Sequence, residues 1–280
     1  MDAQAEEAQQ DDIRTINVKG QRLRIAIRRG NGASTPLLLM NGIGVSLEGF
    51  QRLVDELDPG IEIIRFDVPG TGGSPTPTMP YCLSTLCCLI VQVLDQLGYK
   101  QVDVLGISWG GGLAQQFAFQ YRQRCRRLIL VSTGPGAFMV PGRPSVLMKI
   151  ATPQRFMDPA HMMDIAPDIF GGDLQSNPEL VRQIANAMQF DEPLGYFYQT
   201  MAGIGWTSLP FLTLLQQPTL ILAGDDDPIV PAINAKIIQM LIPRSKLYIF
   251  HGGHLGLLTH AKELVPLIGQ FLAAYTRAYL

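Results

Sequence analysis

Charged residues are scarce in this sequence. Asp, Glu, Lys and Arg make up 16% of the 280 residues, the formal net charge is −2, and lysine and arginine form no cluster. A charged fraction of about a quarter is usual for a globular protein. Because binding to a phosphate backbone requires clustered basic side chains, we expect no nucleic-acid partner. So little charge fits contact with an apolar substrate, and it fits a large sheet core equally well.

Residues that bind metals, form disulfides or cross membranes are also few. The four cysteines have no C-x-x-C spacing, and neither they nor the four histidines form a cluster with metal-ligand spacing. We therefore expect no metal, no cofactor and a reducing compartment. No apolar stretch approaches the ~20 residues of a membrane span. The acidic segment 1–12 lacks the features of a signal peptide, so we expect a disordered N-terminal lead-in and a cytoplasmic protein.

What the sequence does contain is an alternation of apolar strand-like runs with helical patterns. Such an alternation is typical of a parallel sheet that is covered by helices on both faces. An antiparallel pair of strands is expected to precede it. The expected strands are residues 13–18, 23–28, 36–40, 61–66, 102–106, 127–131, 218–223 and 246–250, and the expected helices are residues 47–57, 81–97, 109–121, 231–241 and 260–279.

The segment 134–217 interrupts this alternation. It is rich in proline and glycine, has helix-like pieces near residues 180–189 and 194–202, and lacks a good strand. We predict that residues 13–133 and 218–280 form the core and that residues 134–217 form a lid. Seven of the eleven methionines lie in this segment. Because methionine adapts to irregular apolar shapes, they fit a pocket for variable alkyl chains, or simply the small core of the lid.

The pentapeptide Gly106-Ile107-Ser108-Trp109-Gly110 is the strongest chemical signal. It lies between a strand-like run and a helix-like run, and strand, G-x-S-x-G, helix is the context of a nucleophile elbow. Ser108 is therefore the predicted nucleophile. The alternative interpretation is a glycine-rich turn without chemistry.

A serine hydroxyl needs a base within hydrogen-bond reach and an acid that orients this base. His254 lies beyond the last expected strand, at the edge where parallel sheets assemble their sites, and it is the predicted base, with His251 as its rival. The acid should lie between the serine and the histidine in chain order. Asp227, one of three consecutive aspartates after the strand 218–223, is the predicted acid, and Asp225 is the alternative.

Two backbone N–H groups are expected to form an oxyanion hole. One belongs to Trp109, directly after the nucleophile. The other belongs to Ile43, in a glycine-containing loop that follows the strand 36–40. The alternative interpretation is that this loop is a plain glycine-rich loop. The candidate substrate contacts are Asn41, Met162, Phe197 and Trp206, and we expect that trimming Met162 or Phe197 changes the preference for acyl chain length.

These residues resemble the α/β-hydrolase superfamily over nearly the whole chain, through D-x-x-G-x-G-x-S at residues 67–74, the elbow at Ser108, Asp227 and Gly-Gly-His254. The segments 41–44, 106–117, 205–208 and 224–228 look more narrowly like the intracellular medium-chain-length polyhydroxyalkanoate depolymerases. The resemblance implies an α/β-hydrolase fold, with a mostly parallel eight-stranded sheet, helices on both faces and a helical lid insertion. It maps the triad onto Ser108, Asp227 and His254, and it implies a hydrophobic polyester substrate at the surface of intracellular granules.

The expected activity is hydrolysis of ester bonds in medium-chain-length poly(3-hydroxyalkanoate), with release of 3-hydroxyalkanoic acids or oligomers. Related polyester synthases carry cysteine at the elbow, so Ser108 favours hydrolysis over polymerisation. Asn41 stands where many superfamily members have histidine, which weakens the analogy to generic esterases. The alternatives are a small-molecule carboxylesterase or carbon–carbon bond hydrolase of the same fold, and a ligand-binding protein on a hydrolase scaffold. The oligomeric state is left open.

Overall fold

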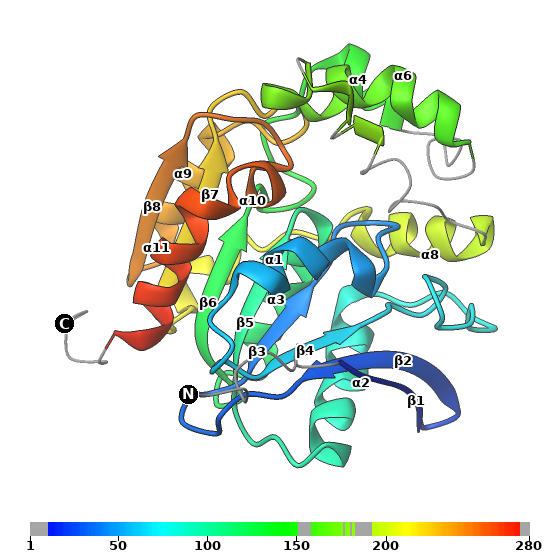
Figure 1. The fold of residues 1–280 in the computed structure, drawn as a ribbon, viewed down its shortest axis with the longest axis vertical. Coiled ribbons are helices and arrows are strands. Elements are labelled where there is room, and N and C mark those ends of the chain that lie inside the picture. Colours follow the sequence, from blue (N-terminus) through cyan, green and yellow to red (C-terminus); the bar gives the residue numbers. More distant parts are fainter. Residues whose placement is uncertain (1–10, 151–157, 176, 180, 183–191, 275–280) are drawn as a thin grey trace, which may run out of the picture.

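The computed structural model describes residues 11–150, 158–175, 177–179, 181–182 and 192–274, and within these residues eight strands form one sheet (Figure 1). The order across the sheet is β1-β2-β4-β3-β5-β6-β7-β8. β1 and β2 pair antiparallel, as do β2 and β4, and the other neighbours pair parallel. The bounds are β1 Asp12–Val18, β2 Gln21–Arg28, β3 Leu37–Met40, β4 Ile63–Phe66, β5 Val102–Ile107, β6 Cys125–Val131, β7 Thr219–Gly224 and β8 Ser245–Phe250. The expected fold class is confirmed.

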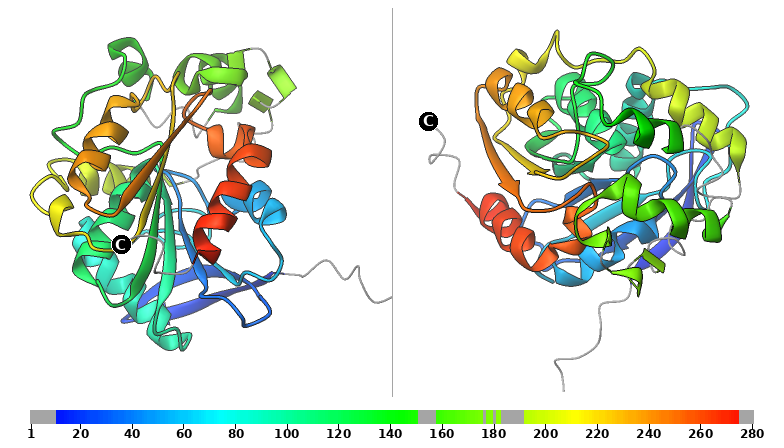
Figure 2. Two further views of the ribbon diagram at one scale, coloured as in Figure 1. Left: turned by 90° about the vertical axis from the view of Figure 1, so that its left-hand side faces the viewer. Right: turned by 90° about the horizontal axis from the view of Figure 1, so that it is seen from above.

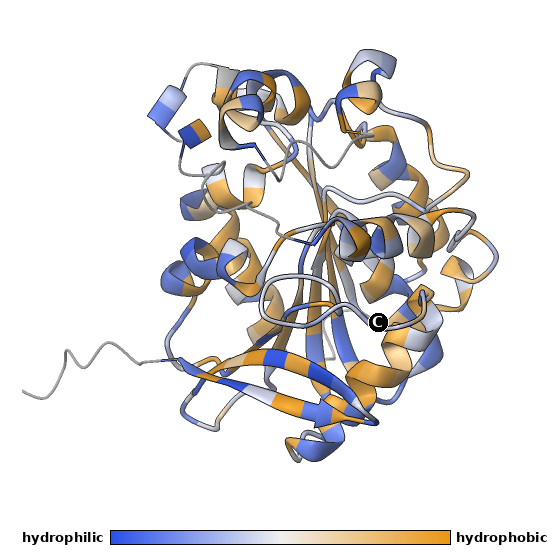
Figure 3. Ribbon diagram, turned by 90° about the vertical axis from the view of Figure 1, so that its right-hand side faces the viewer, coloured by the Kyte–Doolittle hydropathy of each residue, from blue (hydrophilic) through white to orange (hydrophobic). Residues whose placement is uncertain are grey.

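The first two strands form the expected antiparallel pair. The hairpin turns at Lys19 and Gly20, which both have positive φ, and Gly20 adopts this conformation without a steric cost. Figure 3 shows hydrophilic and hydrophobic residues alternating along the two strands, as expected where one face of a sheet meets solvent. β1 begins at Asp12, one residue earlier than predicted, whereas residues 1–10 of the predicted lead-in lie outside the described residues.

Helices cover both faces of the sheet (Figure 2). On one face lie α2 Leu83–Gln96, α3 Trp109–Gln120 and α9 Ile233–Leu241, and on the other lie α1 Gln51–Glu56, α10 Gly256–Thr259 and α11 Ala261–Ala273. The parallel strands are apolar throughout because alternate side chains enter the two cores. In β3, for example, Leu38 and Met40 pack towards α2 and α3, whereas Leu37 and Leu39 pack towards α1 and α11. The last helix ends at Ala273, earlier than the predicted residue 279.

The order of the strands reverses beside β3, and this reversal determines where a site can form. β3 lies between β4 and β5, so the connections after β3 and after β5 leave the sheet in opposite directions. In open α/β sheets, ligands bind at such a switch point, outside the carboxyl ends of the strands. The loop after β3 and the turn after β5 carry Ile43 and Ser108, respectively.

The segment between β6 and β7 holds helices and no strand in its described residues. The helices α4 Pro144–Ile150, α6 Pro159–Phe170 and α8 Pro193–Gly203 lie above the carboxyl ends of the strands in Figure 1. The short 3-10 helices are η1 Leu47–Phe50, η2 Gly172–Gln175 and η3 Leu212–Leu214. α8 corresponds to the predicted piece at 194–202, whereas most of the piece at 180–189 lies outside the described residues. The end of the segment, from Trp206 to η3, instead packs against the core between the sheet and the helices α2, α3 and α9.

No described helix combines the length and the apolar character that crossing a membrane requires.

Candidate active site

Ser108 occupies a strained turn between β5 and α3. Its φ of 54° and ψ of −120° lie outside the regions that L-residues commonly adopt. The flanking glycines are needed because the chain is crowded: a Cβ at Gly106 would lie 2.3 Å from the carbonyl oxygen of Gly110, and a Cβ at Gly110 would lie 2.2 Å from that of Met40. The local geometry is that of the predicted elbow.

A continuous chain of hydrogen bonds joins Ser108, His254 and Asp227. Nε2 of His254 lies 2.9 Å from Oγ of Ser108, and Nδ1 of His254 lies 2.7 Å from Oδ2 of Asp227. An ionised carboxylate only accepts hydrogen bonds, so the tautomer that fits this geometry carries its proton on Nδ1 and leaves Nε2 to accept from the serine hydroxyl. Both His254 and Asp227 are buried. The three residues come from the carboxyl ends of β5, β7 and β8.

The three consecutive aspartates after β7 have different partners. Asp227 faces His254, and its Oδ1 accepts the backbone N–H groups of Ile229 and Val230, each at 2.9 Å. Asp226 instead accepts the backbone N–H of Gly172, in the lid. Asp225, the alternative acid, lies 3.0 Å from Nδ1 of His251 and accepts the backbone N–H of Gly252; the hydrogen bond with His251 lowers the pKa of Asp225.

The remaining histidines lie elsewhere. The side chain of His251, the rival base, is 94% exposed and pairs with Asp225 at the surface. His161 lies in the first turn of α6, where its backbone N–H donates to Asp158. His260 is the N-cap residue of α11, and its ring packs against Phe250. Of the four histidines, only His254 meets Ser108.

One predicted oxyanion donor, Trp109, directly follows Ser108, and the other, Ile43, follows Gly42, which lies beside Ser108. Gly42 lies so close to Ser108 that a Cβ on Gly42 would be 3.7 Å from Cβ of Ser108. Trp109 is the first residue of α3, a position at which the N–H has no acceptor within the helix. Neither Ile43 N–H nor Trp109 N–H donates to any group among the described residues. Both remain available to an oxyanion.

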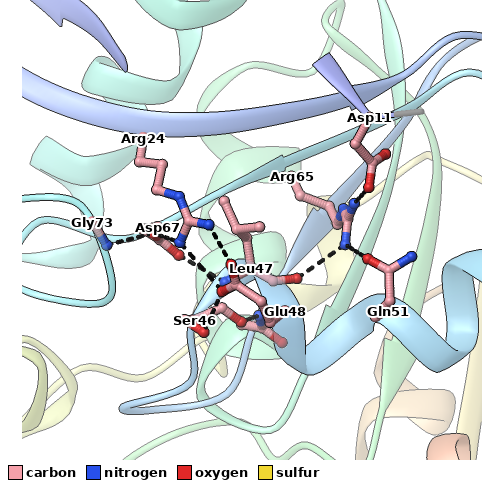
Figure 4. Close-up of polar contacts among 10 residues, drawn as sticks. Asp11, Arg24, Ser46, Leu47, Glu48, Gln51, Arg65, Asp67 and Gly73 are labelled. Carbon is pink, nitrogen blue, oxygen red and sulfur yellow. Dashed lines mark hydrogen bonds and ion pairs between the residues drawn. The ribbon is translucent and has the colours of Figure 1, made fainter. Parts of the chain in front are cut away.

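A buried carboxylate anchors the far end of the loop that follows β3, which we call the oxyanion loop (residues 41–46). Asp67 accepts the backbone N–H of Leu47 at 2.7 Å and that of Gly73 at 2.8 Å, and it pairs with Arg24 at 3.3 Å (Figure 4). Burial raises the pKa of Asp67, and the N–H donors oppose this rise. Figure 4 also shows Arg65 donating to the backbone oxygen of Leu47. The D-x-x-G-x-G-x-S segment therefore braces the oxyanion loop.

The surroundings of the triad are apolar. We call the buried side chains that join lid and core here the lid cluster; its members are Val146, Met162, Ile165, Ala166, Ile169, Phe170, Leu174, Val181, Tyr196, Ile229, Val230 and Leu255. Ile43 and Val45 of the oxyanion loop pack against it. The cluster therefore brings lid side chains next to residues that flank Asp227, His254 and the predicted oxyanion donors.

The four candidate substrate contacts occupy different environments. Met162 is fully buried in the lid cluster, whereas Phe197 is exposed on α8. Asn41 is buried, and its side-chain amide donates to the backbone oxygen of Ser46 inside the oxyanion loop. Trp206 packs against Gly112 and donates its indole N–H to Gln116, both on α3. Asn41 and Trp206 thus have hydrogen-bond partners within the protein, and contact of the four residues with substrate stays a prediction.

Sequence reasoning missed the contact between the lid and the histidine loop. The backbone N–H of His254 donates to the carbonyl oxygen of Phe170 at 2.7 Å, and the two rings stack. A Cβ at Gly253 would lie 2.0 Å from the same oxygen. The absence of a side chain at Gly253 therefore lets the lid backbone approach the histidine loop and hold it. No group of residues suited to hold a metal occurs among those described.

Comparison with known proteins agrees with this arrangement. The family model described as "alpha/beta hydrolase fold" matches residues 35–261, so the chain belongs to the α/β-hydrolase family. A poly(3-hydroxyalkanoate) depolymerase from Ectopseudomonas oleovorans is 48% identical over 260 residues, which cover 93% of this chain and 92% of the relative. The family resemblance and the expectation of an ester hydrolase are thereby confirmed.

More distant relatives share the fold. A 2-hydroxymuconate semialdehyde hydrolase from Pseudomonas sp. strain CF600 is 27% identical, over 87% of this chain and 88% of its own. The crystal structure of the enol-lactonase from Burkholderia xenovorans LB400 superposes with a TM-score of 0.82 at 21% identity, and the match covers 93% of this chain and all of the other. At this identity the superposition supports the fold alone.

Proposed function

We propose that this protein is a serine hydrolase that cleaves ester bonds of intracellular medium-chain-length poly(3-hydroxyalkanoate). The observation that carries the proposal is the hydrogen-bonded series Ser108–His254–Asp227 beside two N–H groups that have no acceptor in the described residues. Such a series activates a hydroxyl for attack on an acyl carbon, and such N–H groups stabilise the resulting oxyanion. The 48% identical depolymerase supports the choice of polyester as substrate.

The reaction proceeds through an acyl-enzyme. His254 takes the proton of Ser108 as Oγ attacks the ester carbonyl, and the N–H groups of Ile43 and Trp109 hold the oxyanion. As the intermediate collapses, the ester C–O bond breaks, and His254 protonates the departing hydroxyl end of the polymer. Water then attacks the acyl-enzyme with His254 as base, which releases a 3-hydroxyalkanoic acid or an oligomer and restores Ser108. Each oxyanion donor contributes about 3 kcal/mol of transition-state stabilisation.

The lid cluster supports a preference for medium-length side chains. Ile43, Leu255 and the residues after Asp227 bring apolar surface to both sides of the triad. Each methylene group of a substrate that leaves water contributes about 0.8 kcal/mol. A longer alkyl side chain of the polyester therefore gains binding free energy in these surroundings.

The outer face of α8 supports contact with an insoluble polymer. Leu194, Phe197, Met201 and Ile204 are exposed by 44% to 65%. Their spacing of three, four and three residues places them along one side of α8 and its C-terminal end. Exposed apolar residues gathered in this way are typical of a surface that meets an apolar partner. We assign this stripe to contact with the granule, in the cytoplasm.

The test is to incubate the purified protein with particles of medium-chain and short-chain polyester and to identify the released acids. We expect 3-hydroxyalkanoic acids or oligomers mainly from the medium-chain particles, and none from protein inactivated by a serine-directed phosphonate. Hydrolysis of small soluble esters alone would indicate the carboxylesterase alternative. If the phosphonate fails to label the folded protein, the ligand-binding alternative applies.

Replacing Phe197 with alanine should slow hydrolysis of polymer particles more than hydrolysis of a soluble ester. Loss of about 1 kcal/mol of apolar contact corresponds to roughly five-fold weaker adsorption to particles, with a soluble ester hydrolysed at an unchanged rate. Particle adsorption and turnover of both substrates are the measurements. Met240→Ala is the matched control, because Met240 is 74% exposed on α9, outside the lid. Equal effects of the two substitutions would contradict the assignment of the stripe.

A further inference from the structure

One buried lid residue contacts the oxyanion loop directly. Gln199 of α8 is 1% exposed, and its Oε1 accepts the backbone N–H of Gly44 at 2.7 Å. Its Nε2 donates to Oγ1 of Thr71, in the loop that follows β4. Gly44 directly follows Ile43, whose N–H is one of the two proposed oxyanion donors.

The same residue also contacts the other donor. The indole N–H of Trp109 donates to the backbone oxygen of Gln199 at 3.0 Å. α8 packs closely against the loop that follows β4, since a Cβ at Gly195 would lie 2.0 Å from the carbonyl oxygen of Gly70. Gln199 therefore joins α8 to Trp109 and to Gly44, the residue that follows Ile43.

These contacts restrain the orientation of the backbone N–H of Ile43. The peptide unit that contains Ile43 N–H and the one that contains Gly44 N–H share the Cα of Ile43, so holding the second limits rotation of the first. Gly44 has φ +69°, a conformation that glycine adopts at no cost and that does not itself limit the loop. A side-chain amide provides an acceptor for Gly44 and a donor for Thr71 at the same time, which an aliphatic side chain cannot do.

We infer that Gln199 is a positioning residue that holds the oxyanion hole in its active geometry, so that the seating of α8 controls the rate of ester cleavage. The inference rests on the proposed function, whose oxyanion hole it concerns. If α8 shifts, the bonds to Gly44, Thr71 and Trp109 break together. The lid then governs the chemical step as well as access to the site.

The test is the near-isosteric substitution Gln199→Leu, assayed with a soluble medium-chain ester. Small displacements of oxyanion donors are costly, so kcat should fall by between about ten-fold and a hundred-fold while KM changes by less than about two-fold. An alkyl boronic acid, whose tetrahedral adduct with Ser108 places an oxygen in the oxyanion hole, should bind more weakly by a similar factor. Inhibition by the carboxylic acid product should stay nearly constant, because the product resembles the ground state.

Gln217→Leu is the matched control. Gln217 is also a buried glutamine, and its amide donates to the backbone oxygen of Ala118, at a distance from the oxyanion loop along α3. Its loss should lower the unfolding midpoint without changing kcat or boronic acid binding. A parallel fall of kcat in both variants would overturn the inference, as would unchanged kcat in a folded Gln199→Leu protein.

Thr71→Val tests the inference if Gln199→Leu does not fold. It removes the hydroxyl that accepts from Gln199 while keeping the shape of the side chain. A lower kcat with KM unchanged supports the positioning role, and an unchanged kcat overturns it. Failure of the proposed function looks different, because the wild-type protein would then release no acids from medium-chain polyester particles, whatever the variants do with a soluble ester.

Discussion

Ser108→Ala should lower kcat for ester hydrolysis by about 10⁴-fold or more. The substitution removes the hydroxyl that forms the acyl-enzyme, and with it the proton that His254 accepts as general base. Stability should change little, because alanine fits the space of the serine and only the bond to Nε2 of His254 is lost. Loss of this hydrogen bond should lower the free energy of unfolding by about 1 kcal/mol, and Tm by a few degrees.

The matched control is Ser132→Ala. Like Ser108, Ser132 has a positive φ and follows a central strand, here β6. It is buried, and its hydroxyl has no hydrogen-bond partner among the described residues. Its replacement should leave kcat within about two-fold of the wild-type value. Turnover of a soluble ester and mass-spectrometric detection of phosphonate labelling measure both variants. If Ser108→Ala kept more than a tenth of the wild-type turnover, Ser108 would not be the nucleophile.

The sheet and the elbow could be predicted because their signals are local. Each parallel strand is buried on both faces, so its sequence is an apolar run, and the structure moves the expected strand boundaries by at most two residues. The elbow needs glycine because backbone atoms a few residues away, such as the carbonyl oxygen of Gly110, crowd the position of Gly106. Constraints of this kind involve residues that lie close together in the sequence, so a short segment is enough to predict them.

The contacts of the lid could not be predicted in the same way. Their partners lie far along the chain: Gly44 and Gln199 are 155 residues apart, and His254 meets Phe170 across 84 residues. Proline at the start of α4, α6 and α8, and again inside α6, blurs the helical pattern. The indole N–H of Trp206 likewise donates to Gln116 of α3, which lies 90 residues earlier in the chain.

Asp227→Asn should lower kcat by about 10⁴-fold, whereas Asp225→Asn should change it by less than about two-fold. The reason lies in the hydrogen bonds of Asp227. Its Oδ1 accepts the N–H groups of Ile229 and Val230, so an asparagine keeps its carbonyl oxygen there and turns its NH₂ towards His254. Nδ1 must then act as an acceptor, which moves the imidazole proton to Nε2. In this tautomer His254 cannot accept the proton of Ser108.

Asp225 provides the comparison because it also pairs with a histidine, three residues before His254. That pair lies at the surface, where the side chain of His251 is 94% exposed, and it meets no nucleophile. Nuclear magnetic resonance of ¹⁵N-labelled histidine reports the tautomer of His254 directly, and kcat with a soluble ester reports its consequence. A large loss in Asp225→Asn together with near-normal turnover in Asp227→Asn would reverse the assignment of the acid. If Asp227→Asn is inactive while Nδ1 keeps its proton, the tautomer explanation fails, and the lost charge itself, which stabilises the imidazolium, is what the reaction requires.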